Sequence, residues 1–275
     1  MTDEWEFTAE ELGPAPDRYE TINALNWSTL KLINDSPRAL TYAAENKRKD
    51  TGWMQLGRAI HCWALERSQF IRRYAEAPDF GDLRTKEGKA KRAAFLADLG
   101  DREMLTAKQS TIVYAAGKSL SEHKIARKLL EGKHEQIITW THPGTSIACK
   151  GRIDVASDRV VDLKSTSLSN IRMILSDAAS RLYHGQSAWY HDGAITSGLL
   201  TPDALLPANV WVQNEAPFDV VCAEMTEETF EAGQELYERL IAQYRGCQAA
   251  GWWPGMAPEM VEWVLPKWAL RSEEQ

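Results

Sequence analysis

The sequence predicts a fold of the α/β (α+β) class, in which a small mixed β-sheet is flanked by helices. Three strand-like runs follow one another between residues 134 and 165, and two more lie between residues 209 and 225. Segments with apolar residues at helical spacing precede, separate and follow these two groups. The 275 residues can bury a substantial core, and we expect a flexible arm at residues 1–20 and a single domain over residues 21–275.

The composition is that of an ordinary soluble protein, with 44% hydrophobic and 26% charged residues. No apolar run approaches the length of a membrane span and the first residues are acidic, so we expect a cytoplasmic protein without a membrane partner. The four cysteines are scattered without C-x-x-C spacing, which argues against a zinc ribbon or a disulfide framework. A net charge of −7 argues against a protein that coats DNA generally, but it leaves room for a nuclease with a local basic lining.

The helices can be placed from caps and apolar spacing. A first helix begins near Asn26 or Ser28, either of which can cap it, and Ser36 followed by Pro37 ends it and starts another. Further helices are predicted at residues 52–74, 104–130, 168–182, 183–200 and 227–250.

The remaining segments are strands, loops and a tail. Strands are predicted at residues 134–141, 146–156, 159–165, 209–214 and 219–225. Residues 80–101 are charged and contain glycines, so we expect a solvated loop with a short helix. The irregular tail at residues 251–271 carries four tryptophans, and such a segment either caps the core or packs against a neighbouring subunit.

The second and third strands carry the residues that suggest chemistry. Side chains alternate along a strand, so Asp162 and Lys164 share one face while Val161 and Leu163 enter the core. If the two strands pair as a hairpin, Asp154 comes level with Asp162. Two neighbouring carboxylates repel unless a cation lies between them, and oxygen ligands of this kind suit Mg²⁺ or Mn²⁺. Beside such a metal a lysine can polarise a water, which suggests a metal-dependent phosphodiesterase.

Each motif alone has a simpler explanation. An Asp-x-Lys sequence occurs by chance in many chains, and Glu135, which could add a carboxylate, fits an exposed strand end equally well. His61 lies among apolar residues, where a histidine is more often part of the core than a ligand. Lys31 and Arg38 are candidates for phosphate contacts, although each alone is better explained by a solvated basic face.

Four motifs in order resemble the PD-(D/E)xK nuclease superfamily. They are Asp154 on one strand, the Asp162-x-Lys164 sequence on the next, the Gly-x-x-x-His sequence that ends at His61, and the Gln186-x-x-x-Tyr190 sequence. Gln186 and Tyr190 share a helix face. The last two motifs resemble the RecB-like branch, and residues 26–42 and 56–70 are similar to RecE-type nuclease domains. The name-giving Pro-Asp is absent, since Ile153 precedes Asp154, a variation that the branch also shows.

The resemblance implies roles for these residues. Asp154, Asp162, His61 and the backbone carbonyl of Leu163 would hold Mg²⁺, for which Mn²⁺ can substitute. Lys164 would orient the attacking water or stabilise charge in the transition state. The remaining candidates would position the DNA strand or assist the metal: Gln186 and Tyr190 first, then Glu135, Lys31, Arg38 and Arg152.

The resemblance also implies an activity and partners. We expect a Mg²⁺-dependent exodeoxyribonuclease that degrades linear double-stranded DNA 5′→3′ and leaves a 3′ overhang for phage-type recombination. Relatives form closed rings, so we expect a ring-shaped homo-oligomer, trimer or tetramer, with a RecT-like single-strand annealing protein as partner. The alternatives are a RecB-like endonuclease, a 3′→5′ exonuclease, and a noncatalytic subunit that binds DNA ends.

Overall fold

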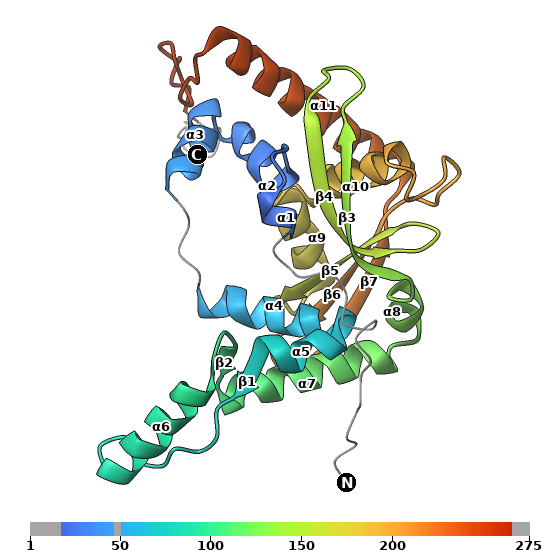
Figure 1. Ribbon diagram of the computed structural model, residues 1–275. Helices are drawn as coiled ribbons and strands as arrows, with labels where there is room; N and C mark the ends of the chain where they lie inside the picture. The colour runs from blue at the N-terminus through green and yellow to red at the C-terminus, as the bar shows by residue number, and fades with distance from the viewer. Residues whose placement is uncertain (1–17, 47–50, 266–275) are drawn as a thin grey trace, which may run out of the picture.

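The computed structural model describes residues 18–46 and 51–265, and its centre is a five-stranded mixed sheet with helices on both faces (Figure 1). The strand order is β3-β4-β5-β6-β7. Every neighbouring pair is antiparallel except β5 and β6, which are parallel. The predicted fold class is therefore confirmed. The strands are β3 (Lys133–Thr141), β4 (Ala148–Ala156), β5 (Val160–Thr166), β6 (Ala208–Gln213) and β7 (Val220–Glu224).

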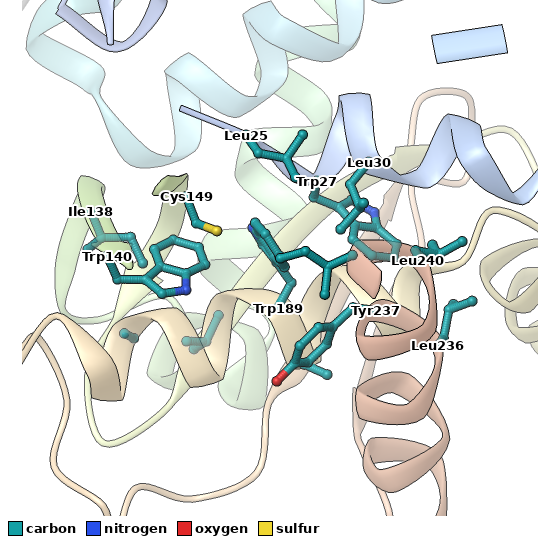
Figure 2. Packing of buried hydrophobic residues seen from close by; sticks show 14 of the residues in the cluster. Leu25, Trp27, Leu30, Ile138, Trp140, Cys149, Trp189, Leu236, Tyr237 and Leu240 are labelled. Atoms are coloured by element: carbon teal, nitrogen blue, oxygen red, sulfur yellow. The ribbon is translucent and has the colours of Figure 1, made fainter. Parts of the chain in front are cut away.

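One face of the sheet is covered by the helices that connect the two parallel strands. Parallel neighbours need a crossover, and here it consists of α9 (Ile171–Ser180) and α10 (Tyr183–Thr196). Helix α11 (Glu227–Ala250) packs against α10 and closes this layer. Figure 2 shows Trp189 of α10 in the middle of the resulting core, with its ring centroid 4.9 Å from that of Trp140 and 5.8 Å from that of Tyr237.

The other face is covered by α4 (Gly52–Leu65), α5 (Arg67–Arg73), α7 (Ala107–Glu122) and α8 (Lys124–Leu129). The predictions of single helices at residues 52–74 and 104–130 were wrong. Glu66 leaves the helical region (φ −131°, ψ 53°) and separates α4 from α5. The ends of both segments form a small parallel sheet of β1 (Tyr74–Glu76) and β2 (Glu103–Leu105), and a capping box of Thr106 and Gln109 starts α7.

The N-terminal helices follow the predicted caps. The described chain begins with α1 (Arg18–Thr21), and the rest of the expected arm lies outside the described residues. Asn26 caps α2 (Trp27–Leu30) by accepting a hydrogen bond from the Thr29 N–H, and a 3-10 turn (Lys31–Asn34) follows. Ser36 caps α3 (Pro37–Glu45) with Pro37 in its first turn, as predicted. Helix α6 (Lys86–Asp98) is the short helix of the charged loop and projects from the body (Figure 1).

The sheet opens between β4 and β5. The ladder between these strands contains only the pairs Val155–Val161 and Ala156–Val160 among the residues that the structure describes. Further along β4, the neighbour on that side is Leu25, whose N–H donates to Ala148 O at 2.9 Å. The strands thus diverge directly before Asp154, which leaves room for a cleft.

Part of the tryptophan-rich tail caps the core. Residues 251–265 contain no helix or strand. The ring of Trp253 packs against Tyr244 of α11 at 5.5 Å, and the Pro254 carbonyl accepts a hydrogen bond from the Arg38 N–H. Trp263 is exposed and Trp268 lies outside the described residues. Within residues 18–46 and 51–265, no helix has the length and apolarity that a membrane span requires.

Candidate active site

The opening of the sheet leads into a cleft of about 1480 Å³. Its walls come from α2, α3, α4 and α9, and its floor includes β4 and β5. Most of the residues that the sequence singled out lie along it: His61, Glu135, Arg152, Asp154, Asp162, Leu163, Lys164, Gln186, Tyr190 and Lys31. Arg38 is exposed on α3 outside this lining, so the structure does not bring it to the site.

Three of these residues form a cage at the bottom of the cleft. The Nε2 atom of His61 lies 2.9 Å from Oδ2 of Asp154, and its Nδ1 atom lies 3.1 Å from Oε1 of Glu135. One ligand atom can be taken from each residue so that all three atoms lie within 4.8 Å of one another. One imidazole nitrogen with two carboxylate oxygens is a donor set suited to a divalent cation such as Mn²⁺ or Mg²⁺.

The positive charge of a protonated His61 offsets part of the negative charge of the two carboxylates. Both ring nitrogens of His61 face carboxylate oxygens, and both can donate only when the imidazole is protonated. Burial by itself lowers the pKa of His61, but Asp154 and Glu135 outweigh this effect and raise the pKa to about 10. Burial raises the pKa of Asp154, but His61, Lys164 and the Leu163 N–H lower it to about 2.

The Gly-x-x-x-His motif explains how α4 reaches the cage. A Cβ atom on Gly57 would lie 3.1 Å from Oγ of Ser165, so the glycine allows α4 to approach β5 closely. His61 follows about one helical turn later on the same face, and Leu56 and Ile60 anchor the helix in the core. The glycine of this motif thus lets α4 pack closely on β5.

Glu135 enters the cage through an unusual backbone conformation. The register of β3 and β4 pairs His134 with Val155 and Gln136 with Ile153, so Glu135 faces Asp154 across the ladder. This pair is missing from the regular register, and Glu135 has a φ of 51°, in the left-handed region. For a residue other than glycine this conformation costs about 1–3 kcal/mol and occurs mainly at functional sites. Two carboxylates directly opposite each other also repel.

The cage residues fit a bound cation. The Oε1 atom of Glu135 is buried and faces Nδ1 of His61 at 3.1 Å, while Oε2 lies 3.2 Å from Nε of Arg152. One divalent cation would offset the repulsion between the two buried, facing carboxylates. His61, Glu135 and Asp154 are therefore the residues that could hold a metal ion, for which His61 would give up one ring proton.

Asp162 and Lys164 form a second group beside the cage. The Nζ atom of Lys164 lies 2.7 Å from Oδ1 and 2.6 Å from Oδ2 of Asp162, and Nδ2 of Asn209 lies 3.3 Å from Oδ2. Burial raises the pKa of Asp162 more than Lys164 lowers it. Burial lowers the pKa of Lys164, but Asp162 and Asp154 reverse this and raise it, so the lysine stays charged at neutral pH.

The two aspartates therefore differ in their surroundings. Asp154 turns across the gap between the strands, where its Oδ2 atom accepts a hydrogen bond from the Leu163 N–H at 2.9 Å. Asp162 is engaged by the lysine and Asn209, outside the cage of three. Its predicted role as a metal ligand, and that of the Leu163 carbonyl, stay predictions.

Gln186 and Tyr190 share the cleft face of α10. Gln186 forms a side-chain hydrogen bond to Tyr190, and burial raises the pKa of this tyrosine. A Cβ atom on Gly151 of β4 would lie 3.0 Å from the Tyr190 ring, so the glycine lets the ring lie close against the strand. The helix thus holds both polar side chains next to the two strands of the site.

Two residues of the site were missed in the sequence. Asn209 reaches Asp162 because the parallel register pairs these two residues, and a long-range register leaves no local sign. The ring centroid of Tyr183 lies 5.1 Å from Nζ of Lys164, and Leu182 before it has a φ of 60°. A tyrosine at the start of the second predicted helix after the site strands was the available signal.

Comparison with known proteins agrees with this geometry. Residues 26–262 match the family model described as a PDDEXK-like domain of unknown function (DUF3799). The chain belongs to this family. The PDDEXK-like domain is also similar in structure to a "putative exonuclease" from Eubacterium rectale, with a TM-score of 0.60 and 12% sequence identity over 90% of this chain and 88% of the other. At this identity the similarity shows the fold alone. No curated protein matches the sequence.

Proposed function

We propose that this PDDEXK-like domain is a metal-dependent nuclease that hydrolyses phosphodiester bonds of DNA. The observation that carries the proposal is the cage of His61, Glu135 and Asp154 with the Lys164 ammonium beside it, at the bottom of a large cleft. Family membership and the structural likeness to the Eubacterium rectale protein support it.

Each residue of the site has a distinct role in the proposed hydrolysis. A divalent cation held by the cage would make hydroxide available near neutral pH and offset charge on the phosphate. Lys164 stays protonated beside Asp162 and offers its ammonium to an attacking water or to a phosphate oxygen. Arg152 holds the outer oxygen of Glu135, and Gln186 and Tyr190 line the cleft where they can orient the strand.

The specific activity we propose is 5′→3′ digestion of linear double-stranded DNA with Mg²⁺, leaving a 3′ overhang for recombination. The likeness of the motifs to RecE-type nuclease domains supports this direction, and the Eubacterium rectale relative bears the name of an exonuclease. We further propose a cytoplasmic, ring-shaped homo-oligomer, trimer or tetramer, which would retain duplex DNA between cleavage steps, and a RecT-like annealing partner for the overhang.

Hydrolysis is tested with linear duplex DNA and Mg²⁺. The wild type is expected to release mononucleotides. Asp154→Asn removes a charged metal ligand and Lys164→Ala removes an ammonium beside the reacting phosphate, so each is expected to lower the rate on the order of 10²–10³-fold or more. Asp158→Asn is the matched control, since this exposed aspartate lies in the turn of the same hairpin. Release of nucleotides by Asp154→Asn at the wild-type rate would refute the proposal.

Polarity is tested with substrates labelled at either the 5′ or the 3′ end. Early release of the 5′ label supports the proposed direction, whereas early release of the 3′ label identifies a 3′→5′ exonuclease. Nicking of covalently closed circles identifies an endonuclease. Tight binding of DNA ends without hydrolysis by any metal-loaded preparation identifies a noncatalytic subunit.

A further inference from the structure

Trp53 is an exposed tryptophan on the wall of the cleft. It lies in the first turn of α4, lines the cleft, and is 69% exposed. Its ring stacks on no other ring in the part of the chain that the structure describes. Trp63, on the same helix, instead packs at 4.9 Å against Phe70 and 4.6 Å against Tyr114. The fold therefore uses Trp63 for stability but leaves the Trp53 ring in solvent.

The position of Trp53 relative to the cage is set by the helix. Trp53, Gly57 and His61 follow one another at four-residue spacing and all line the cleft. At a rise of 1.5 Å per residue, the eight residues from Trp53 to His61 span about 12 Å. Stacked nucleotides in one strand advance about 3.4 Å each, so this distance corresponds to roughly three to four nucleotides.

The surroundings of Trp53 favour a nucleic-acid strand over a protein segment. The same cleft is lined by basic side chains of Lys31, Arg58 and Arg152 and by polar side chains of Asn26 and Ser28. Arg58 is paired with Glu103 and Arg152 with Glu135. Aromatic rings interleaved with basic residues are the pattern that binds single strands, because every base offers a face for stacking. Trp53 and the three cage residues line this same cleft.

We propose that Trp53 is a stacking platform for a base of the DNA strand being cleaved, about three to four nucleotides from the scissile phosphate. The inference rests on the proposed function in taking the strand to be DNA. Trp53 contributes binding and register, and takes no part in the bond that breaks. Its substitution should therefore change the affinity for DNA and the KM while it leaves kcat close to the wild-type value.

The first test measures equilibrium binding of fluorescently labelled single-stranded oligonucleotides by anisotropy, in an Asp154→Asn background with Mg²⁺. Trp53→Ala should weaken binding on the order of 5- to 150-fold, the usual effect of removing a base-stacking ring. Trp53→Phe keeps a stacking face and should restore most of the affinity. Trp252→Ala is the control, because Trp252 is also exposed (59%) but lies outside the cleft.

The second test locates the stacked base. An abasic nucleotide is placed at each successive position of the oligonucleotide, and the binding of wild type and Trp53→Ala is compared at each one. The difference between the two proteins should disappear when the abasic site is about three to four nucleotides from the end that is cleaved, and persist at the other positions. A difference that persists at all positions would overturn the proposal.

The remaining outcomes separate this inference from the proposed function. If the wild type binds DNA through Trp53 but never hydrolyses it, the nuclease proposal fails and the stacking platform stands. If the wild type hydrolyses DNA and Trp53→Ala binds and cleaves as the wild type does, the stacking platform alone fails. A change in oligomeric state of Trp53→Ala and Trp53→Phe alike, seen by light scattering, would identify a protein contact and overturn the inference.

Discussion

At the scale of single residues, Glu135 combines an unfavourable backbone conformation with repulsion between carboxylates. Its backbone is left-handed, its carboxylate faces that of Asp154, and its Oε1 atom is buried beside His61. A divalent cation would offset this free-energy cost, because it attracts both carboxylates and can be bound by an oxygen of each.

Replacement of Glu135 by glutamine should therefore weaken metal binding with little change in shape. Changes outside a first coordination shell already cost 10- to 100-fold in affinity, so loss of a charged ligand should cost on the order of 100-fold or more. Titration calorimetry with Mn²⁺ measures the effect, with Glu131→Gln, exposed just before β3, as the control. An unchanged dissociation constant would remove Glu135 from the cage.

Tyr183 should act on the lysine through its ring. The Lys164 ammonium lies 5.1 Å from the ring centroid, and a cation–π contact of this kind contributes about 0.5–2 kcal/mol. Tyr183→Ala should lower kcat about 2- to 30-fold at an unchanged KM, because the ammonium loses its support. Tyr183→Phe should retain most of the rate. Equal losses in both variants would instead assign the effect to the hydroxyl group.

At the scale of elements, the contact between α10 and α11 depends on a glycine. A Cβ atom on Gly233 would lie 2.4 Å from the carbonyl oxygen of His184, which is backbone and cannot move aside as a side chain would. This close approach keeps α10, with Gln186 and Tyr190, pressed between the sheet and α11.

Gly233→Ala should lower the free energy of unfolding by about 1–3 kcal/mol or more, as overpacking does. Gly246→Ala on the same helix is the matched control, since nothing lies within 4 Å of its added Cβ atom. This control should raise the stability by about 0.5–1 kcal/mol, because alanine favours the helix. Denaturation in urea measures both, and a stable Gly233→Ala would contradict the packing described here.

Asp192 links the same two helices by charge. Its carboxylate accepts hydrogen bonds from Tyr237 and from Gln234 of α11, and from the neighbouring His191. Burial raises the pKa of Asp192, but these hydrogen bonds lower it below the usual value in total. A depressed pKa in the folded state means that this stabilisation is present above the pKa of the unfolded chain, about 3.9, and is lost as the pH falls through the lower folded-state pKa.

Asp192→Asn should thus destabilise the protein by about 1–3 kcal/mol near pH 7, the range for hydrogen bonds to charged groups. The difference from the wild type should shrink as the pH falls below about 4, because the wild-type carboxyl then becomes protonated as well. Thermal unfolding at a series of pH values measures it, with Glu231→Gln on the exposed side of α11 as the control. A difference that is constant with pH would contradict the linkage.

Local signals predicted the elements, and long-range contacts limited the prediction of the site. The caps at Asn26 and Ser36 could be read directly because a cap depends on the next few residues. The break between α4 and α5 at Glu66 could not be read from the sequence, because no proline or glycine marks it. Glu66 instead forms an ion pair with Arg73, seven residues later. Glu135 was recognised as a candidate, but its place opposite Asp154 follows from a strand register that the sequence does not state.

At the scale of the whole molecule, metal binding should be visible as stability. A ligand that binds only the folded protein stabilises it by RT ln(1 + [L]/Kd), about 2.7 kcal/mol at 100 times the dissociation constant. For a chain of this size, this corresponds to a rise in Tm of roughly 5–10 °C on addition of Mn²⁺ or Mg²⁺ after chelation. Asp154→Asn should show no such rise. Calorimetric scans measure it, and an equal rise in both proteins would place the ion elsewhere.

The divergence of β4 from β5 also has a mechanical consequence. The two parts of the sheet are joined only by the pairs at Val155 and Ala156 in the described ladder. The part formed by β3 and β4 carries Glu135 and Asp154, and the part formed by β5, β6 and β7 carries Asp162 and Lys164. A small rotation about these two pairs would change the distances from Glu135 and Asp154 to Asp162 and Lys164 together, so one motion would set whether the two halves of the site meet across a substrate.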